Sequence, residues 1–144
     1  MNQPNTFQTQ RNFSVKPSEI FEALSDPARL SKWWGPNGFT NTFEVFEFRE
    51  GGNWQFLMNG PDGSSYPNQC VFLEVVENKK IVIQHINQPH FTLTIELSTN
   101  NGETQLLWTQ EFEDSKIANA MKQIVTQANE ENLDRLELNL NGKL

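Results

Sequence analysis

Cysteine is nearly absent from this chain of 144 residues, since Cys70 is the only one. A single cysteine excludes an intrachain disulfide and a cysteine-rich zinc site. Its apolar neighbours Val71 and Phe72 predict a buried strand thiol, because a nucleophilic cysteine needs an exposed sulfur and a nearby base. The two histidines, His85 and His90, do not by themselves suggest a metal centre. We therefore expect no metal and no other cofactor.

Positive charge is also scarce. The chain has 11 Lys and Arg against 18 Asp and Glu, which gives a net charge of −7. Such a balance disfavours nonspecific binding to nucleic acid or to an anionic membrane. The one basic pair, Lys79 and Lys80, falls where a turn between strands is expected. We therefore expect no nucleic acid and no membrane as partners.

Long apolar runs are missing as well, and none approaches the roughly 20 residues that span a bilayer. The first residues, MNQPNTFQTQ, lack the basic and apolar regions of a signal peptide, which predicts a cytoplasmic protein. Residues 1–6 are polar and contain a proline, so we expect a loose tail there. The length of 144 residues predicts a single domain over 1–144.

Aromatic residues, in contrast, are abundant: the chain has 11 Phe, 4 Trp and 1 Tyr. Each Phe and Trp removes a large apolar area from water when it is buried. The composition therefore predicts a bulky aromatic interior, either filled or partly hollow.

The first third of the chain predicts a strand followed by two short helices. Residues 7–15 alternate with a period of two, which indicates a half-buried strand. Pro17 begins a helix that runs to about Ser25. Asp26 followed by Pro27 is typical of a helix N-cap, and the second helix continues to the tryptophan pair at 33–34. This pair is either a lid over a cavity or a plug that docks the helices.

Residues 31–63 predict a β-hairpin. Strands are expected over 39–48 and 54–59, with Gly51 and Gly52 supplying the positive φ angles of the turn. The apolar residues of the first strand change parity, which indicates either a β-bulge near Phe46 or burial on both faces. Residues 60–63 form a strong turn signal.

The remaining chain predicts four more strands and a long helix. The strands are expected at 66–76, 81–86, 91–97 and 104–112, and their short turns indicate an antiparallel meander of about seven strands in all. From Ser115 to about Leu140 apolar residues recur at helical spacing, giving a rod of roughly 37 Å. The apolar residues of this helix are Ile117, Met121, Ile124, Val125, Ala128, Leu133, Leu136 and Leu140. A twisted sheet of this size curls, and one helix cannot fill its concave side, so a cavity is expected.

Strand parity identifies candidates for the walls of this cavity. The predicted ligand-binding residues are Trp54, Phe56, Met58, His85, Trp108 and Met121. Gln110 and Glu74 are further candidates to supply polar atoms. Aromatic walls with a few polar groups are typical of binding sites for small apolar molecules. The alternative is that these aromatic residues simply fill the core.

His85 is the one candidate for catalysis, because an imidazole can donate or accept a proton near neutral pH. No partner for it can be identified from the sequence, and a structural histidine is the alternative. Glu74 either faces solvent at a sheet edge or is buried with a raised pKa beside Arg11 or Arg49. No catalytic constellation can be identified, so the sequence does not decide whether the protein is an enzyme.

Several motifs point to a known family. They are Asp26-Pro27 with Leu30, Trp33-Trp34-Gly35-Pro36, Gly38-Phe39-Thr40, Phe48-Arg49 with Gly51-Gly52, Trp54-Gln55-Phe56, Gly60-Pro61-Asp62-Gly63 and Phe72-Leu73-Glu74-Val75. With the order of elements, they resemble the START-like superfamily (SRPBCC, Bet v 1-like), and within it the Hsp90 ATPase activator C-terminal domain family. The family's usual proline after Arg49 is Glu50 here.

The resemblance implies an α+β helix-grip fold, in which a curved antiparallel sheet wraps around the C-terminal helix. It also implies a ligand-sized cavity and supplies no catalytic set. We therefore expect binding of a small hydrophobic ligand between sheet and helix. The alternatives are a cyclase- or hydrolase-like enzyme that uses His85, and a co-regulator of an Hsp90-type chaperone ATPase. A homodimer is a further possibility.

Overall fold

The structure is a computed structural model that describes residues 5–144. Its elements, in chain order, are β1 (Thr6–Phe13), α1 (Pro17–Ser25), α2 (Pro27–Trp33), β2 (Thr40–Phe46), β3 (Asn53–Asn59), β4 (Ser65–Val76), β5 (Lys80–His85), β6 (Phe91–Asn100), β7 (Glu103–Phe112) and α3 (Ser115–Leu140). The predicted α+β order of one strand, two short helices, six strands and a long helix is confirmed. Within residues 5–144, no helix combines the length and apolar character needed to cross a membrane.

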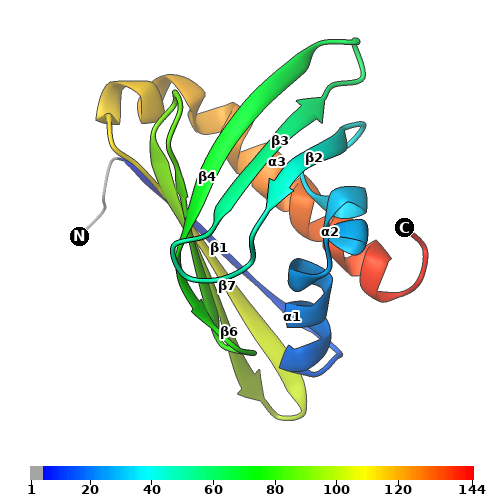
Figure 1. Ribbon diagram of the computed structural model, residues 1–144. Helices are drawn as coiled ribbons and strands as arrows, with labels where there is room; N and C mark the ends of the chain where they lie inside the picture. Colours follow the sequence, from blue (N-terminus) through cyan, green and yellow to red (C-terminus); the bar gives the residue numbers. More distant parts are fainter. Residues whose placement is uncertain (1–4) are drawn as a thin grey trace.

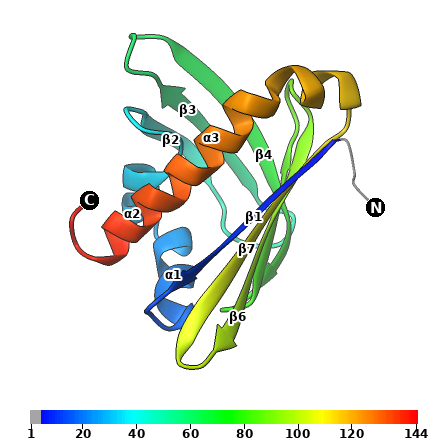
Figure 2. The ribbon, with the colours of Figure 1, turned by 180° about the vertical axis from the view of Figure 1, so that it is seen from behind.

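The seven strands form one antiparallel sheet in the order β1-β7-β6-β5-β4-β3-β2. The first strand therefore pairs with the last, and the edges of the sheet are β1 and β2. Figures 1 and 2 show the sheet twisting strongly while α3 crosses one side of it, with α1 and α2 beside the C-terminal half of α3. This is the helix-grip arrangement that the sequence predicts.

The N-terminal strand begins earlier than expected. Asn5 Nδ2 donates a hydrogen bond of 2.6 Å to the carbonyl oxygen of Phe112, and the Phe112 N–H donates one of 2.8 Å to the Asn5 carbonyl. Thr6 is already part of β1. The prediction of a loose tail over residues 1–6 is thus corrected at Asn5 and Thr6, because β7 offers them backbone partners. Residues 1–4 lie outside the described residues.

The change of parity in β2 comes from a β-bulge. The pairing register between β2 and β3 shifts between Phe43 and Val45, slightly before the expected position near Phe46. The extra residue brings Phe43 and Phe46 to the same side, where their ring centroids lie 5.5 Å and 5.8 Å from that of Trp54.

The two glycines before β3 are needed for different reasons. Gly51 has a φ of +79°, as predicted for the turn. Gly52 does not have a positive φ, so that part of the prediction is wrong. A Cβ atom at Gly52 would instead clash with the backbone carbonyl oxygen of Glu47. The second glycine therefore permits a close approach of two backbone segments.

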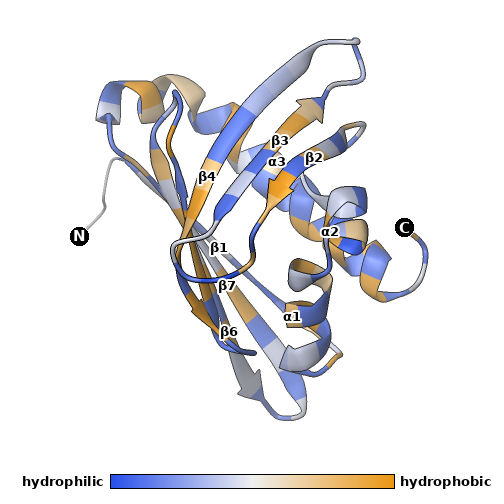
Figure 3. Ribbon diagram, in the orientation of Figure 1, coloured by the Kyte–Doolittle hydropathy of each residue, from blue (hydrophilic) through white to orange (hydrophobic). Residues whose placement is uncertain are grey.

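The core lies between the concave face of the sheet and the helices. Hydrophobic and hydrophilic residues alternate along the strands in Figure 3, as expected for strands with one buried face. Trp54 is at the centre of an aromatic cluster, with ring centroids 4.3 Å from Phe56 and 5.8 Å from Phe72. On α3, Leu133 and Leu136 are completely buried, so the C-terminal half of the helix closes this core.

A buried arginine joins α3 to the loop 34–39, which connects α2 to β2. Arg135 is 9% exposed, and burial lowers its pKa below the ordinary value of 12.5. Its guanidinium donates five hydrogen bonds of 2.8–3.1 Å to the carbonyl oxygens of Lys32, Trp34, Gly35, Pro36 and Phe39. Because carbonyls at a helix end and in an irregular loop lack regular backbone partners, this one side chain supplies donors for them.

Two asparagines complete the attachment of the loop 34–39. Asn132 on α3 accepts from the Gly35 N–H and donates to the Trp33 carbonyl, both at 3.1 Å. Asn41 on β2 donates to the carbonyls of Ser31 and Trp34 at 3.1 Å and 2.8 Å. Side chains from α3 and from β2 therefore hold this segment from two sides.

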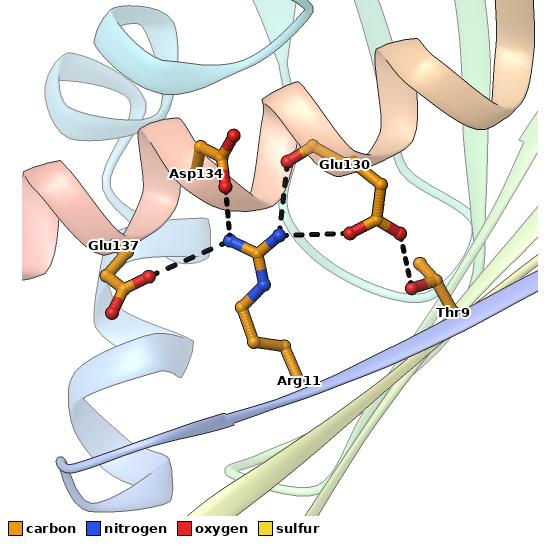
Figure 4. Close-up of polar contacts among 5 residues, drawn as sticks. All are labelled: Thr9, Arg11, Glu130, Asp134 and Glu137. Atoms are coloured by element: carbon orange, nitrogen blue, oxygen red, sulfur yellow. Dashed lines mark hydrogen bonds and ion pairs between the residues drawn. The ribbon is translucent and has the colours of Figure 1, made fainter.

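A second arginine attaches α3 to β1 (Figure 4). Arg11 forms ion pairs with Glu130 at 3.0 Å, Asp134 at 2.7 Å and Glu137 at 3.7 Å. Partial burial alone would lower the pKa of Arg11, but the hydrogen bonds and charges of Asp134 and Glu130 outweigh that effect and raise it. The three carboxylates are about half exposed, so water screens these pairs.

We predict that the two arginines differ sharply in their effect on stability. Arg135→Met leaves buried carbonyls without donors and should lower the free energy of unfolding by about 3 kcal/mol. The matched variant Arg11→Met removes half-exposed ion pairs and should cost about 1 kcal/mol or less. Denaturant unfolding of both variants measures the difference. Equal losses would contradict the role assigned to Arg135.

Candidate ligand cavity

A cavity of about 220 Å³ lies between the concave face of the sheet and the N-terminal half of α3. Its walls come from β3 to β7, from α3 and from the loop 34–39. The larger apolar side chains that line it are Trp34, Phe56, Met58, Ile83, Phe91, Leu93, Trp108, Met121, Ile124 and Val125. The hollow space expected from the curl of the sheet is therefore present.

The cavity lies beside a helix that is packed near both of its ends. Ala118 and Val125 are buried together with Phe112, and Leu133 and Leu136 are fully buried further along α3, whereas Ile124 is 69% exposed. Ile124 was expected on the apolar face, and that expectation is corrected: it lies at the rim of the cavity. A rod that crosses a curved sheet contacts it over one stretch and bridges it over another.

Five of the six predicted ligand-binding residues line this cavity: Phe56, Met58, His85, Trp108 and Met121. Trp54 does not line it. The Trp54 side chain is 1% exposed and stacks between Phe56 and Phe72, so Phe56 presents the ring at the surface of the cavity. Ligand binding by these residues stays a prediction.

The two further polar candidates, Gln110 and Glu74, lie in different places. Gln110 lines the cavity, and its Oε1 accepts a hydrogen bond of 3.1 Å from Asn129 Nδ2 on α3. Glu74 lies away from it and pairs with Lys80 at 3.5 Å, so neither Arg11 nor Arg49 is its partner. Glu74 is 41% exposed on an interior strand of the sheet, rather than at a sheet edge.

The two tryptophans of the pair have different positions: Trp33 docks the short helices, and Trp34 lines the cavity. Trp33 is fully buried, and its Nε1 donates to the Ala23 carbonyl at 3.1 Å, which docks α2 onto α1. Trp34 lines the cavity, with its ring centroid 5.6 Å from that of Trp108. The carbonyl of Trp34 is one of those held by Arg135, so the anchor of the loop also fixes a wall of the cavity.

The lining contains neutral polar groups and no Lys, Arg, Asp or Glu. The amides are those of Asn68, Gln110, Asn129 and Asn132. Cys70 also lines the cavity, and burial raises the pKa of its thiol to about 12, which makes it a poor nucleophile. Among residues 5–144, no three His, Cys, Asp or Glu side chains gather as a metal site would require.

His85 is 5% exposed and its ring stacks on Phe91, with centroids 4.6 Å apart and planes 6° from parallel. Burial lowers the pKa of His85 below 6.5, assisted by the charge of His90, and outweighs the hydrogen bonds of the ring to the carbonyls of Pro89 and Asn87, which raise it. The imidazole is therefore neutral at pH 7.

Both ring nitrogens of His85 already have partners. Nδ1 lies 2.8 Å from the Pro89 carbonyl oxygen, and Nε2 lies 2.7 Å from the side-chain Oδ1 of Asn68. Which nitrogen donates depends on the tautomer, and each of the two lies within hydrogen-bonding distance of a protein oxygen. No ring nitrogen is left free to act on a bound molecule.

Sequence reasoning missed the polar residues that build the site. Asn132, Arg135 and Asn139 are buried on α3, whereas the helical spacing pointed only to its apolar residues. A signal was present, because these positions recur at intervals of three and four among Leu133 and Leu136. Their partners carry no such signal: Asn132 bonds to Trp33 and Gly35, Arg135 bonds to carbonyls between Lys32 and Phe39, and Asn139 bonds to Arg29 and Leu144.

The fold and this cavity define a single helix-grip domain, and comparison with known proteins agrees. Residues 14–141 match the family model described as "Activator of Hsp90 ATPase homolog 1-like protein". The chain belongs to this family, as its motifs indicate.

Among solved structures, a protein from Nitrosomonas europaea is 20% identical with a TM-score of 0.89, covering 99% of this chain and 98% of that one. An Arthrobacter aurescens protein is 20% identical with a TM-score of 0.88, covering 96% and 87%. The AHSA1 protein from Silicibacter pomeroyi is 19% identical with a TM-score of 0.76, covering 96% and 99%. These likenesses show the fold. No curated protein matches this chain.

We predict a stability that depends on the protonation of His85. Because the unfolded chain takes up this proton near pH 6.5 and the folded chain only at lower pH, the free energy of unfolding should fall as the pH drops below 6.5. His85→Gln should flatten that part of the profile. Proton NMR of the imidazole should give a midpoint below 6.5 in the folded protein. A midpoint above it would mean a doubly protonated ring held by two acceptors.

Proposed function

We propose that this protein binds a small hydrophobic molecule in the cavity between the sheet and α3. The observation that supports the proposal is the space of about 220 Å³ with aromatic and aliphatic walls and no charged side chain in its lining. An apolar cavity of roughly 150 Å³ accommodates benzene. Sites for drug-sized ligands begin at about 300 Å³. The proposed guest therefore has one or two rings.

The polar groups of the cavity support binding better than catalysis. A general base needs a lone pair within reach of the substrate, but both nitrogens of His85 have protein partners. A thiol nucleophile needs a lowered pKa, but burial raises that of Cys70 to about 12. The cyclase- or hydrolase-like alternative thus lacks an activated group in this arrangement.

The cavity can be tested by filling it. Titration with indane, followed by tryptophan fluorescence, should saturate for the natural sequence. Ala128 lines the cavity from α3, so Ala128→Phe should weaken binding at least about tenfold by occupying the space. Ala120→Phe, an exposed position on the same helix, is the matched control and should bind normally.

Two results would contradict the proposal: no saturation up to the solubility of indane, or equal binding by the two variants. Native mass spectrometry of protein purified from its own host complements the titration. A retained small molecule, absent from Ala128→Phe, would identify the natural guest.

The family description favours a second candidate, the regulation of a chaperone ATPase, because it names an activator of Hsp90 ATPase. The net charge of −7 makes the protein acidic, and this charge is the feature that could attract a chaperone with a basic surface. If this role holds, the purified protein raises the ATPase rate of an Hsp90-type chaperone from the same host in a saturable way. An unchanged rate at saturating protein removes this candidate.

A further inference from the structure

Most polar side chains in the lining of the cavity have their hydrogen-bonding atoms in use. The oxygen and the nitrogen of the Asn132 amide both bond to the main chain. Both nitrogens of His85 lie within hydrogen-bonding distance of protein oxygens, one of which is Asn68 Oδ1. Asn68 Nδ2 in turn donates to the Tyr66 carbonyl. These three side chains are committed to the protein, so the polar contacts of a guest have to be sought elsewhere in the lining.

Gln110 and Asn129 form the exception, and both line the cavity. Gln110 Oε1 accepts a hydrogen bond of 3.1 Å from Asn129 Nδ2, which links β7 to α3. Within residues 5–144, the other atom of each amide, Gln110 Nε2 and Asn129 Oδ1, has no hydrogen-bond partner. The pair thus leaves one donor group and one acceptor unused.

The nitrogen of the Gln110 side chain is not sealed inside the protein. In the described part of the chain, the unpartnered side-chain polar atoms that are fully enclosed are Asn41 Oδ1 and the Nε1 atoms of Trp54 and Trp108. Gln110 Nε2 is not one of them, so it keeps accessible surface. The Gln110 side chain is only 8% exposed and lies on the buried face of β7, which bounds the cavity. An acceptor for this donor can therefore come from a molecule in the cavity.

The paired amides can present either end of the Gln110 side chain to a guest. When both amides turn over together, Gln110 Nε2 donates to Asn129 Oδ1, their mutual hydrogen bond is kept, and Gln110 presents its oxygen instead. A guest with only an acceptor matches one arrangement, and a guest with only a donor matches the other. A guest that carries an N–H group beside a carbonyl matches both.

The lining also restricts the charge of a guest. It contains no Lys, Arg, Asp or Glu. A carboxylate or an ammonium group would lose its hydration without gaining a counterion. A neutral amide loses less, and the amide of Gln110 replaces part of the hydration that it loses.

From these observations we propose the chemical class of the ligand: a compact, uncharged ring compound with an N–H group next to a carbonyl, as in a lactam, bound by the side-chain amide of Gln110. This inference rests on the proposed function, because it needs a guest in the cavity. It adds that the guest carries an amide group, and that Gln110 selects for that group.

The test compares three probes of similar shape: oxindole, which is a lactam, indane, and indane carboxylate. The measured quantity is the ratio of the dissociation constants of indane and oxindole, in the natural sequence and in Gln110→Met. Oxindole loses more hydration than indane on binding. This cost is the same for both proteins, so it cancels when the two ratios are compared.

Gln110→Met keeps the length of the side chain and removes both of its hydrogen-bonding atoms. It should shift the ratio about 3- to 10-fold in favour of indane, the range expected for one hydrogen bond. Indane carboxylate should bind the natural sequence more weakly than indane, because the lining offers no counterion.

Gln105→Met is the matched control, because Gln105 lies on the same strand but does not line the cavity. This variant should leave the ratio unchanged. If Gln110→Met fails to fold, the natural protein still carries the test. Saturation with oxindole should shift the NMR resonances of the Gln110 side-chain amide protons, and indane should shift them much less.

The outcomes separate this inference from the function on which it rests. Equal ratios in the natural sequence and in Gln110→Met, or unchanged Gln110 amide resonances at saturation with oxindole, overturn the inference and leave the cavity as a binding site. Tighter binding of the carboxylate than of indane overturns the uncharged class. The same shift of the ratio in Gln105→Met would assign it to the strand in general and overturn the role of Gln110. Failure of oxindole and indane alike to bind overturns both the inference and the proposed function.

Discussion

The contact between Arg135 and the carbonyls around the loop 34–39 is the constraint on which the rest of the structure depends. Burying a guanidinium is costly unless its donors are all directed at acceptors. Here Nη1 and Nη2 donate to five main-chain oxygens, without any carboxylate. The contact fixes the C-terminal half of α3, the end of α2 and the start of β2 relative to one another, and sets the position of Trp34.

α3 is attached to the sheet near both of its ends. In its C-terminal half Leu133 and Leu136 pack against the core and Arg11 on β1 pairs with Glu130 and Asp134, and near its N-terminal end Ala118 is buried with Phe112. Between these attachments the helix passes over the concave face, and Met121 lines the open space. The cavity is thus a consequence of how α3 is attached, and its apolar walls are the inward faces of the strands.

Much of this could be predicted from sequence because it depends on local periodicity. Period-two strands, the Asp26 cap and the apolar spacing of α3 are local signals, and the elements lie within a few residues of their expected bounds. How deeply a side chain is buried does not depend on local sequence alone. Trp54 and Phe56 share a face of β3, but only the partners from β2 and β4 decide that one is covered and the other lines a cavity. The bonds of Arg135 span about a hundred residues and have no local pattern.

Folding leaves a hollow apolar space between the sheet and α3, and both the wall residues and the proposed ligand depend on it. Xenon occupies such spaces without chemical specificity, so a crystal structure determined under xenon pressure tests the claim most directly. We expect xenon between Trp108 and Met121. Density that shows this space closed by side chains, with no xenon bound, would contradict it.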